Sequence, residues 1–184
     1  MTLWDLLPAR ALARVESAFR LGRSRSRKGA HKKTVRSATA RRPSPMQVRY
    51  ETMTRELLEA HGIRVRKWRT SMSGVAWEVR YRDGTTARLI EAPRPKGPMS
   101  AAVFLHEVGH HVIGLGAYRP RCREEYHAWA WAIAEMERRG INVTESVRRR
   151  MTRSLEYAVA KAKRRGIKSV PQELRAFDRT DTPT

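Results

Sequence analysis

The sequence has 184 residues, of which 39 are lysine or arginine and 18 are aspartate or glutamate, giving a formal net charge of +21 at pH 7. This length suggests one domain with extensions. The single cysteine, Cys122, excludes both an internal disulfide and a zinc site made of cysteines alone. No apolar stretch is long enough to cross a bilayer and no secretion signal is recognisable, so we expect a cytoplasmic protein.

Residues 1–45 form a basic tail in which we expect largely disordered chain. From Leu21 to Pro45 the tail has no aspartate or glutamate and almost no apolar side chains. Such a segment cannot bury enough surface to offset the entropy that it would lose on ordering. Positive charge attracts polyanions, so nucleic acid is an expected partner. The alternative is a basic tail without any dedicated partner.

Residues 46–140 are expected to form the main domain, which we assign to the α+β class. Its first helix has recognisable ends. Ser44 suits the capping position, and Pro45 suits the first helical position. Gly62 can end the same helix, because glycine readily adopts the left-handed conformation found there.

Three strand-like segments follow this helix. They cover residues 63–68, 75–82 and 85–91, and the second alternates apolar and polar side chains. Asp83-Gly84, between the second and third segments, is a strong hairpin signal. Together these features predict a small three-stranded antiparallel sheet.

Helices are predicted for the rest of the chain, with capping residues at several starts. Residues 141–184 are assigned to a basic, helical C-terminal extension, whose cationic face either is simply solvated or contacts phosphates. The expected helices run from Ser100 to Ile113, from Arg121 to Arg138, from a Thr144 cap through Glu145 to Arg165, and onward from Pro171.

The helix expected at 100–113 contains the pattern HExxH, formed by His106, Glu107 and His110. Residues four apart lie on the same face of a helix, so the two histidines can bind one metal ion. Glu107 lies about 100° around the helix from His106 and can act on water beside the metal. Zn²⁺ makes such water more acidic, and a carboxylate can then take its proton. This arrangement predicts zinc-dependent hydrolysis, with Glu107 as the catalytic base.

The alternative for this motif is a pair of hydrogen-bonded core histidines beside a salt-bridged glutamate. Apolar residues cluster on both sides of the helix, which indicates that the helix is buried. Buried imidazoles need partners for their ring nitrogens, and a metal ion supplies one. We therefore favour the metal site.

A catalytic zinc usually has three protein ligands, so a third must come from elsewhere in the chain. On the next helix, Glu125 falls within the apolar face that includes Trp129, whereas Glu124 and His127 fall outside it. A carboxylate on a buried face needs a cation, so we predict Glu125 as the third ligand. An arginine partner for Glu125 is the alternative. Glu124 and His127 are interpreted as solvated groups or as groups that support the ligands.

Transition-state stabilisation is assigned to no single residue. Acyl-transfer sites need a donor aimed at the oxyanion of the tetrahedral intermediate. The candidates that lie near the motif in sequence, either for this role or as support for the ligands, are His111, Tyr118, Tyr126 and His127.

The succession of helix, small sheet, HExxH helix and glutamate-bearing helix resembles the ImmA/IrrE family of zinc metallopeptidases. The family motif continues with a helix of Glu-Ala-Asn-x-Phe-Ala type, and residues 125–130 of this chain occupy that place. Glu125, Trp129 and Ala130 fit the pattern, whereas Tyr126 and His127 depart from it. The SprT-like proteases are less similar, because this chain lacks the four cysteines of their usual zinc ribbon.

The resemblance implies a minimal zincin fold of the gluzincin type and a zinc-dependent metalloendopeptidase. Several members of the family cleave transcriptional repressors, which implies a protein substrate associated with DNA. A second hypothesis comes from the charge of the chain. It is a basic nucleic-acid-binding protein with a structural or vestigial metal site, and it predicts strongly salt-dependent DNA binding without proteolysis.

Overall fold

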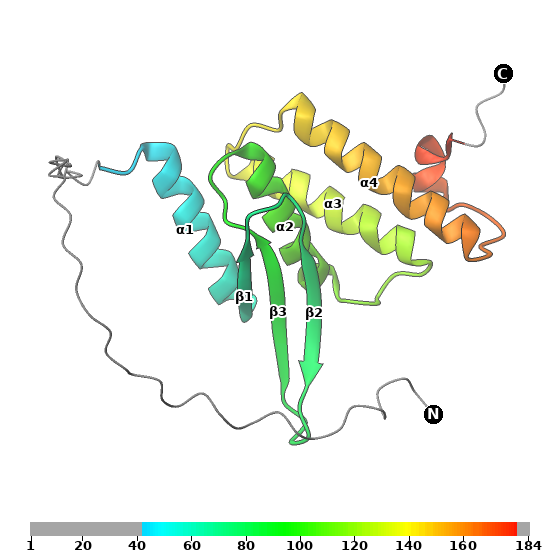
Figure 1. Ribbon diagram of the computed structural model, residues 1–184, viewed down its shortest axis with the longest axis horizontal. Helices are drawn as coiled ribbons and strands as arrows, with labels where there is room; N and C mark the ends of the chain where they lie inside the picture. The colour runs from blue at the N-terminus through cyan, green and yellow to red at the C-terminus, as the bar shows by residue number, and fades with distance from the viewer. Residues whose placement is uncertain (1–41, 180–184) are drawn as a thin grey trace, which may run out of the picture. The chain divides into compact units, whose positions relative to one another are not determined.

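The computed structural model describes residues 42–179. Almost all of the tail expected to be disordered therefore lies outside the described residues. The described residues form an α+β fold, as the sequence predicted (Figure 1). In chain order its elements are α1 (Pro45–Ala60), β1 (Ile63–Arg69), β2 (Val75–Arg80), β3 (Thr86–Pro93), α2 (Pro98–Ile113), α3 (Arg121–Arg138), α4 (Glu145–Arg164) and the 3₁₀ helix η1 (Gln172–Phe177).

Several helix ends lie where the sequence predicted them. The Ser44 hydroxyl accepts a hydrogen bond from the Gln47 amide at 3.2 Å, so it caps α1. The Thr144 hydroxyl caps α4 in the same way. The expected cap at Ser100 is wrong, because α2 begins two residues earlier, at Pro98. Ser100 instead accepts hydrogen bonds from backbone amides just before the helix.

The sheet is mixed, which corrects the prediction of an antiparallel sheet. Its strand order is β1-β3-β2, with β2 antiparallel to β3 and β1 parallel to β3. The Asp83-Gly84 turn joins β2 to β3 as expected, but β1 and β2 do not pair with each other. The last strand takes the centre and is the most buried of the three. Ile90 and Ala92 of β3 are fully buried, whereas β1 and β2 are largely exposed.

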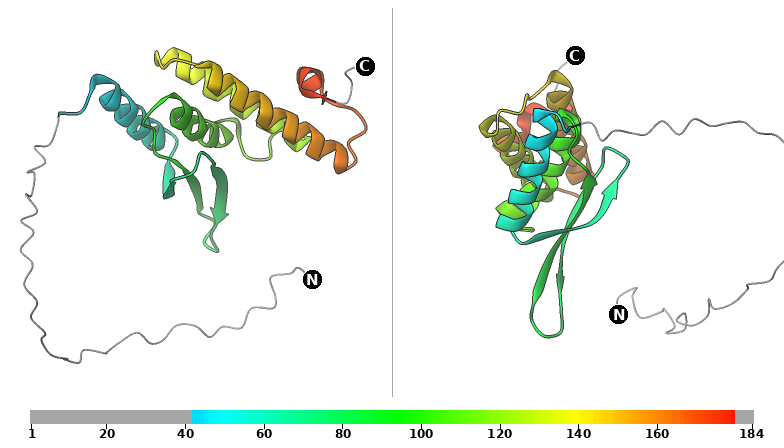
Figure 2. Two further views of the ribbon diagram at one scale, coloured as in Figure 1. Left: turned by 45° about the horizontal axis from the view of Figure 1, so that its top comes forward. Right: turned by 90° about the vertical axis from the view of Figure 1, so that its left-hand side faces the viewer.

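Helix α2 lies at the centre of the fold. Every residue from Ser100 to His111 is buried, since α2 packs on β3 on one side and on α3 on another. In two views the turn between β2 and β3 extends beyond the helices (Figures 1 and 2). The part of the sheet nearest to α2 therefore provides the packing surface, while the hairpin tip is exposed.

The C-terminal helices share this core. Leu155 of α4 and Leu174 of η1 are fully buried and belong to the same cluster as Phe104 of α2. Helix α4 lies along α3 (Figures 1 and 2). The segment assigned above to an extension is thus packed into the same compact unit as the HExxH helix. Within residues 42–179, no helix combines the length and the apolar character needed to span a membrane.

Candidate metal centre

His106 and His110 lie one turn apart on the face of α2 that meets α3. Both are buried, and their ring centroids are 4.7 Å apart. Residues i and i+4 lie on the same face of a helix, so the four-residue spacing of the motif brings both imidazoles together.

Gly109, within the motif, allows α2 and α3 to approach closely. A Cβ atom at this position would lie 2.9 Å from the carbonyl oxygen of Ala128 on α3, which is closer than real Cβ contacts. The absence of a side chain at Gly109 therefore lets the backbone of α3 come near the histidine-bearing face. Glu125 lies about one turn before Ala128 and is brought within reach of both imidazoles.

One carboxylate oxygen of Glu125 completes the cluster. Its Oε2 lies 3.3 Å from His106 Nε2 and 3.6 Å from His110 Nε2, and one ligand atom from each residue lies within 4.8 Å of the others. Zinc bonds of about 2.0–2.2 Å in a tetrahedron put ligand atoms about 3.4 Å apart. The three residues therefore fit a zinc ion in both chemistry and spacing.

The arginine partner considered for Glu125 is also present. Arg121 Nε lies 3.2 Å from Glu125 Oε1, the oxygen that does not face the histidines. Burial acts to raise the pKa of Glu125, but hydrogen bonds from His106 and His110 outweigh it and hold the pKa far below its usual range. Glu125 is therefore a carboxylate anion, the form that binds a metal ion.

Glu124 is fully buried, so of its two interpretations the solvated one is wrong, and the contact with His110 fits a group that supports a ligand. It accepts hydrogen bonds from His110 Nδ1 at 3.1 Å and from the backbone amide of Gly116 at 2.8 Å. The helical wheel missed this position because it represents only the long apolar face of α3. The first turn of α3 is covered on another side by α2 and by the turn at Gly116, so Glu124 is buried outside that face.

The contact with Glu124 determines which nitrogen of His110 can bind a metal. A carboxylate accepts hydrogen bonds, so the proton on His110 Nδ1 is held by Glu124, and Nε2, which faces Glu125, is the nitrogen that can give up its proton to bind a metal ion. For the His110 pKa, burial acts downward, but the hydrogen bond and charge of Glu125 raise it overall. Burial lowers the pKa of His106, which favours its neutral, metal-binding form.

Trp129 holds His106 from the α3 side. The two rings are stacked with centroids 4.4 Å apart and an interplanar angle of 23°. Among residues 42–179, no hydrogen-bond partner contacts His106 Nδ1 or Trp129 Nε1, although both atoms are buried. His106 is therefore oriented by stacking on Trp129 and by the contact of its Nε2 with Glu125, whereas His110 has a hydrogen-bond partner on Nδ1 as well.

Glu107 lies beside the cluster and is only 5% exposed. Burial raises its pKa to about 7, against the opposing charge of His110. Gly74, just before β2, makes room for it, because a Cβ there would lie 2.4 Å from both Glu107 Cγ and Oε1. The sequence pattern gave no sign of this contact, which joins residues far apart in the chain.

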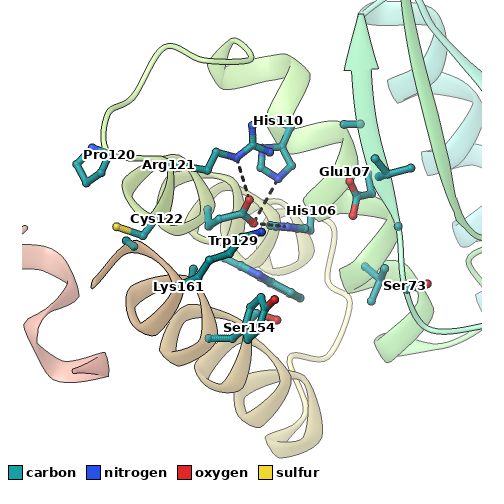
Figure 3. A pocket seen from close by; sticks show the side chains of 18 of the residues that line it. Ser73, His106, Glu107, His110, Pro120, Arg121, Cys122, Trp129, Ser154 and Lys161 are labelled. Carbon is teal, nitrogen blue, oxygen red and sulfur yellow. Dashed lines mark hydrogen bonds and ion pairs between the residues drawn. The ribbon is translucent and has the colours of Figure 1, made fainter. Parts of the chain in front are cut away.

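A pocket of about 830 Å³ opens next to these side chains. Figure 3 shows His106, His110 and Glu107 on one part of its wall, and Ser154 and Lys161 of α4 on another. Three protein ligands beside an open cavity are typical of a catalytic zinc, since a structural zinc is usually enclosed by four.

The remaining residues named as candidates lie outside this pocket. The Nε2–H of His111 donates to the carbonyl oxygen of Leu89 at 3.1 Å, so this imidazole faces the sheet. Tyr118 stacks on His127 with ring centroids 4.0 Å apart, and Tyr126 meets His127 edge-on. The geometry does not bring these four side chains to the cluster. The pocket instead presents residues of α4, whose cationic face was predicted to be solvated or to contact phosphates and not to lie beside the HExxH helix.

Comparison of the chain with family models, with curated proteins and with solved structures found no match.

Proposed function

We propose that this protein is a zinc-dependent metallopeptidase of the ImmA/IrrE-like type. The observation that carries the proposal is the convergence of His106, His110 and Glu125 on one point at the wall of an open pocket, with Glu107 beside them. The donor set favours zinc, since two imidazoles and one carboxylate are a common catalytic zinc set. A bound zinc ion would supply Lewis acidity, polarising a peptide carbonyl and making water more acidic.

Glu107 is suited to the proton transfers of peptide hydrolysis. Burial raises the pKa of Glu107 in the metal-free protein, which makes its carboxylate a stronger base for accepting a proton from water and later donating it to the leaving amine. Glu107 is not held by the histidines or by Arg121, which hold Glu125. Its side chain packs against Gly74 and lines the pocket. The substrate of this reaction is proposed to be a protein, because the HExxH helix and the Glu125 helix resemble those of the ImmA/IrrE peptidases.

The supporting groups also fit this function. Glu124 orients His110, and a carboxylate behind a histidine ligand is a frequent arrangement at catalytic zinc sites. Arg121 neutralises the distal oxygen of Glu125 and pairs with Glu124 at 3.2 Å. Each ligand therefore has a partner that fixes its position before a metal ion binds.

The decisive test compares the metal content and the proteolytic activity of three proteins. The wild type is expected to bind one zinc ion per chain and to cleave casein, an unfolded protein substrate. Glu107→Gln should bind zinc equally well and lose cleavage, whereas His110→Ala should lose zinc. Cleavage by Glu107→Gln at the wild-type rate, or a wild type that binds no zinc, contradicts the proposal.

Binding of nucleic acid is a second candidate function, favoured by the charge of the chain. Besides the net charge of +21, α4 exposes Arg148, Arg149 and Arg153 to solvent. Lys and Arg contacts with phosphates make binding weaken steeply with salt. A filter-binding assay with duplex DNA at rising salt tests this function, and affinity that does not depend on salt would exclude it.

A further inference from the structure

Helix α4 forms a cationic wall of the pocket. Arg150, Ser154, Tyr157, Lys161 and Arg165 recur at intervals of three or four residues, so one face of α4 lines the cavity along most of the helix. Figure 3 shows Ser154 and Lys161 on this face, on the other side of His106 from Glu107. A substrate that reaches the proposed metal site must therefore lie against α4.

The positive charges of this wall are not neutralised within the pocket. Its two lining carboxylates are Glu107 and Glu125, and the latter is already engaged by the histidines and by Arg121. The ion pairs between described residues do not include the three cations of the wall, which are Arg150, Lys161 and Arg165.

Two arginines on another face of α4, Arg148 and Arg149, have acidic neighbours. Arg148 lies 3.7 Å from Glu137, and Arg149 lies 3.5 Å from Glu145, so acidic neighbours partly balance these cations. They do not line the pocket. An excess of positive charge thus remains on the face of α4 beside the cavity, where low-dielectric walls strengthen its field.

Two of the three cations are held in place. Arg150 Nη2 donates to the carbonyl oxygen of Met72 at 3.1 Å, which fixes its guanidinium against the loop between β1 and β2. The other N–H groups of this guanidinium are available to a ligand. Lys161 Nζ lies 5.9 Å from the centre of the Tyr157 ring, within the range of a cation–π contact. Partly ordered cations lose less entropy when a substrate binds.

We infer that this pocket selects polypeptides with acidic side chains next to the bond to be cleaved, which Arg150, Lys161 and Arg165 bind through their carboxylates. The inference rests on the proposed peptidase function, because a peptide at the site must run along α4. Guanidinium groups match the planar geometry of a carboxylate, and Lys161 adds a point charge. The cationic wall of the pocket then favours aspartate or glutamate over lysine or arginine next to that bond.

The test measures binding and cleavage separately. Fluorescent peptides that differ only in a central Asp-Glu, Asn-Gln or Lys-Arg pair are titrated with the Glu107→Gln protein, which does not consume them. We expect the acidic peptide to bind about 5–10-fold more tightly than the neutral one, since each exposed ion pair contributes modestly. The double variant Lys161→Glu/Arg165→Glu in the same background should abolish or reverse this preference.

Arg153→Glu/Arg164→Glu is the matched control, because it makes the same change of charge on exposed positions of α4 that do not line the pocket. It should keep the preference for the acidic peptide. Equal binding of all three peptides, or the same loss in both double variants, overturns the inference. If all three peptides bind equally and only the pocket variant loses binding to a DNA oligonucleotide, the cationic wall binds nucleic acid and the inference is overturned.

Cleavage of the same peptides by the zinc-loaded wild type separates this inference from the proposed function. If the wild type cleaves all three peptides at equal rates and binds them equally, the peptidase stands and the acidic specificity fails. If none is cleaved but the acidic peptide still binds preferentially through α4, the cationic wall stands and the peptidase fails.

Discussion

The imidazole of His110 donates its Nδ1 proton to the carboxylate of Glu124, with 3.1 Å between the two atoms and both side chains almost completely buried. This contact leaves Nε2 of His110 facing Glu125. Because a buried imidazole without such a partner could rotate or change tautomer, Glu124 is expected to organise the metal site without touching the metal.

Replacement of this carboxylate should therefore weaken zinc binding. In Glu124→Gln the amide nitrogen has to face either His110 Nδ1–H or the Gly116 amide, and both are donors. We expect zinc affinity to fall about 10–100-fold, as measured by competition with a chelator. Glu145→Gln, at an exposed carboxylate, is the control. Unchanged affinity of Glu124→Gln would show that Glu124 does not organise the site.

Gly74 should matter for catalysis and not for metal binding. In Gly74→Ala the new Cβ would overlap Glu107, whose flexible side chain has to move away from its present position. A general base typically raises the rate about 10²–10⁴-fold, and a displaced base loses most of this effect. We therefore expect kcat to fall at least about 10-fold. Zinc content should remain equal to that of the wild type.

Gly97→Ala provides the control for this change, since a Cβ at Gly97 meets no atom within 4 Å. It should retain the wild-type kcat. If Gly74→Ala is as active as Gly97→Ala, or if it loses zinc in proportion to activity, Gly74 does not position Glu107 for catalysis.

The raised pKa of Glu107 predicts a pH-dependent stability of the metal-free protein. The pKa rises from 4.5 to about 7 on folding, chiefly through burial. Because the pKa is higher in the folded state, ionisation of Glu107 lowers the free energy of unfolding. The loss is absent below pH 4.5, grows between pH 4.5 and pH 7, and is complete above pH 7. At about 1.4 kcal/mol per pKa unit the full cost is about 3 kcal/mol.

Glu107→Gln removes this ionisation. Urea unfolding in the presence of a chelator should show the variant to be more stable than the wild type by up to about 3 kcal/mol at pH 8 and by less than about 1 kcal/mol at pH 5. Glu137→Gln, at a carboxylate whose side chain is 59% exposed, should give no such trend. A gain that is equal at both pH values would contradict burial of an ionised Glu107.

Leu155 tests whether α4 belongs to the core. Its side chain is fully buried in the cluster that also contains residues of α2 and α3. Leu155→Ala should destabilise the whole domain by about 2–5 kcal/mol in one cooperative transition, measured by denaturant unfolding. The exposed Arg153→Ala should change stability by less than about 0.5 kcal/mol. An early, separate transition in Leu155→Ala would instead show that α4 unfolds independently.

Much of the local structure could be predicted because local chemistry decides it. Ser44 and Thr144 cap helices through hydrogen bonds to amides three residues ahead, and such contacts need no other part of the chain. The spacing of His106 and His110 places them on one helical face by the geometry of the helix alone. Glu125 was predicted from its place on an apolar face, and the structure brings it to the histidines.

The features that the sequence did not predict depend on how helices and strands pack against one another. Hairpin signals predict pairing between consecutive strands, but β3 lies between β1 and β2 and pairs with both, and its burial comes from packing against α2. Glu124 was misplaced because a helical wheel shows one face and says nothing of what covers the end of a helix. His111, Tyr118, Tyr126 and His127 are near the motif in sequence, yet none lines the pocket.

The sequence by itself determined the helices, several of their ends and the two imidazoles that share a face, because these depend on contacts within a few residues. Only the tertiary structure decided that Glu124 supports His110, that Gly74 leaves room for Glu107 and that α4 forms the far wall of the pocket. Each of these relationships joins elements whose approach depends on the packing of the whole core, which no local pattern records.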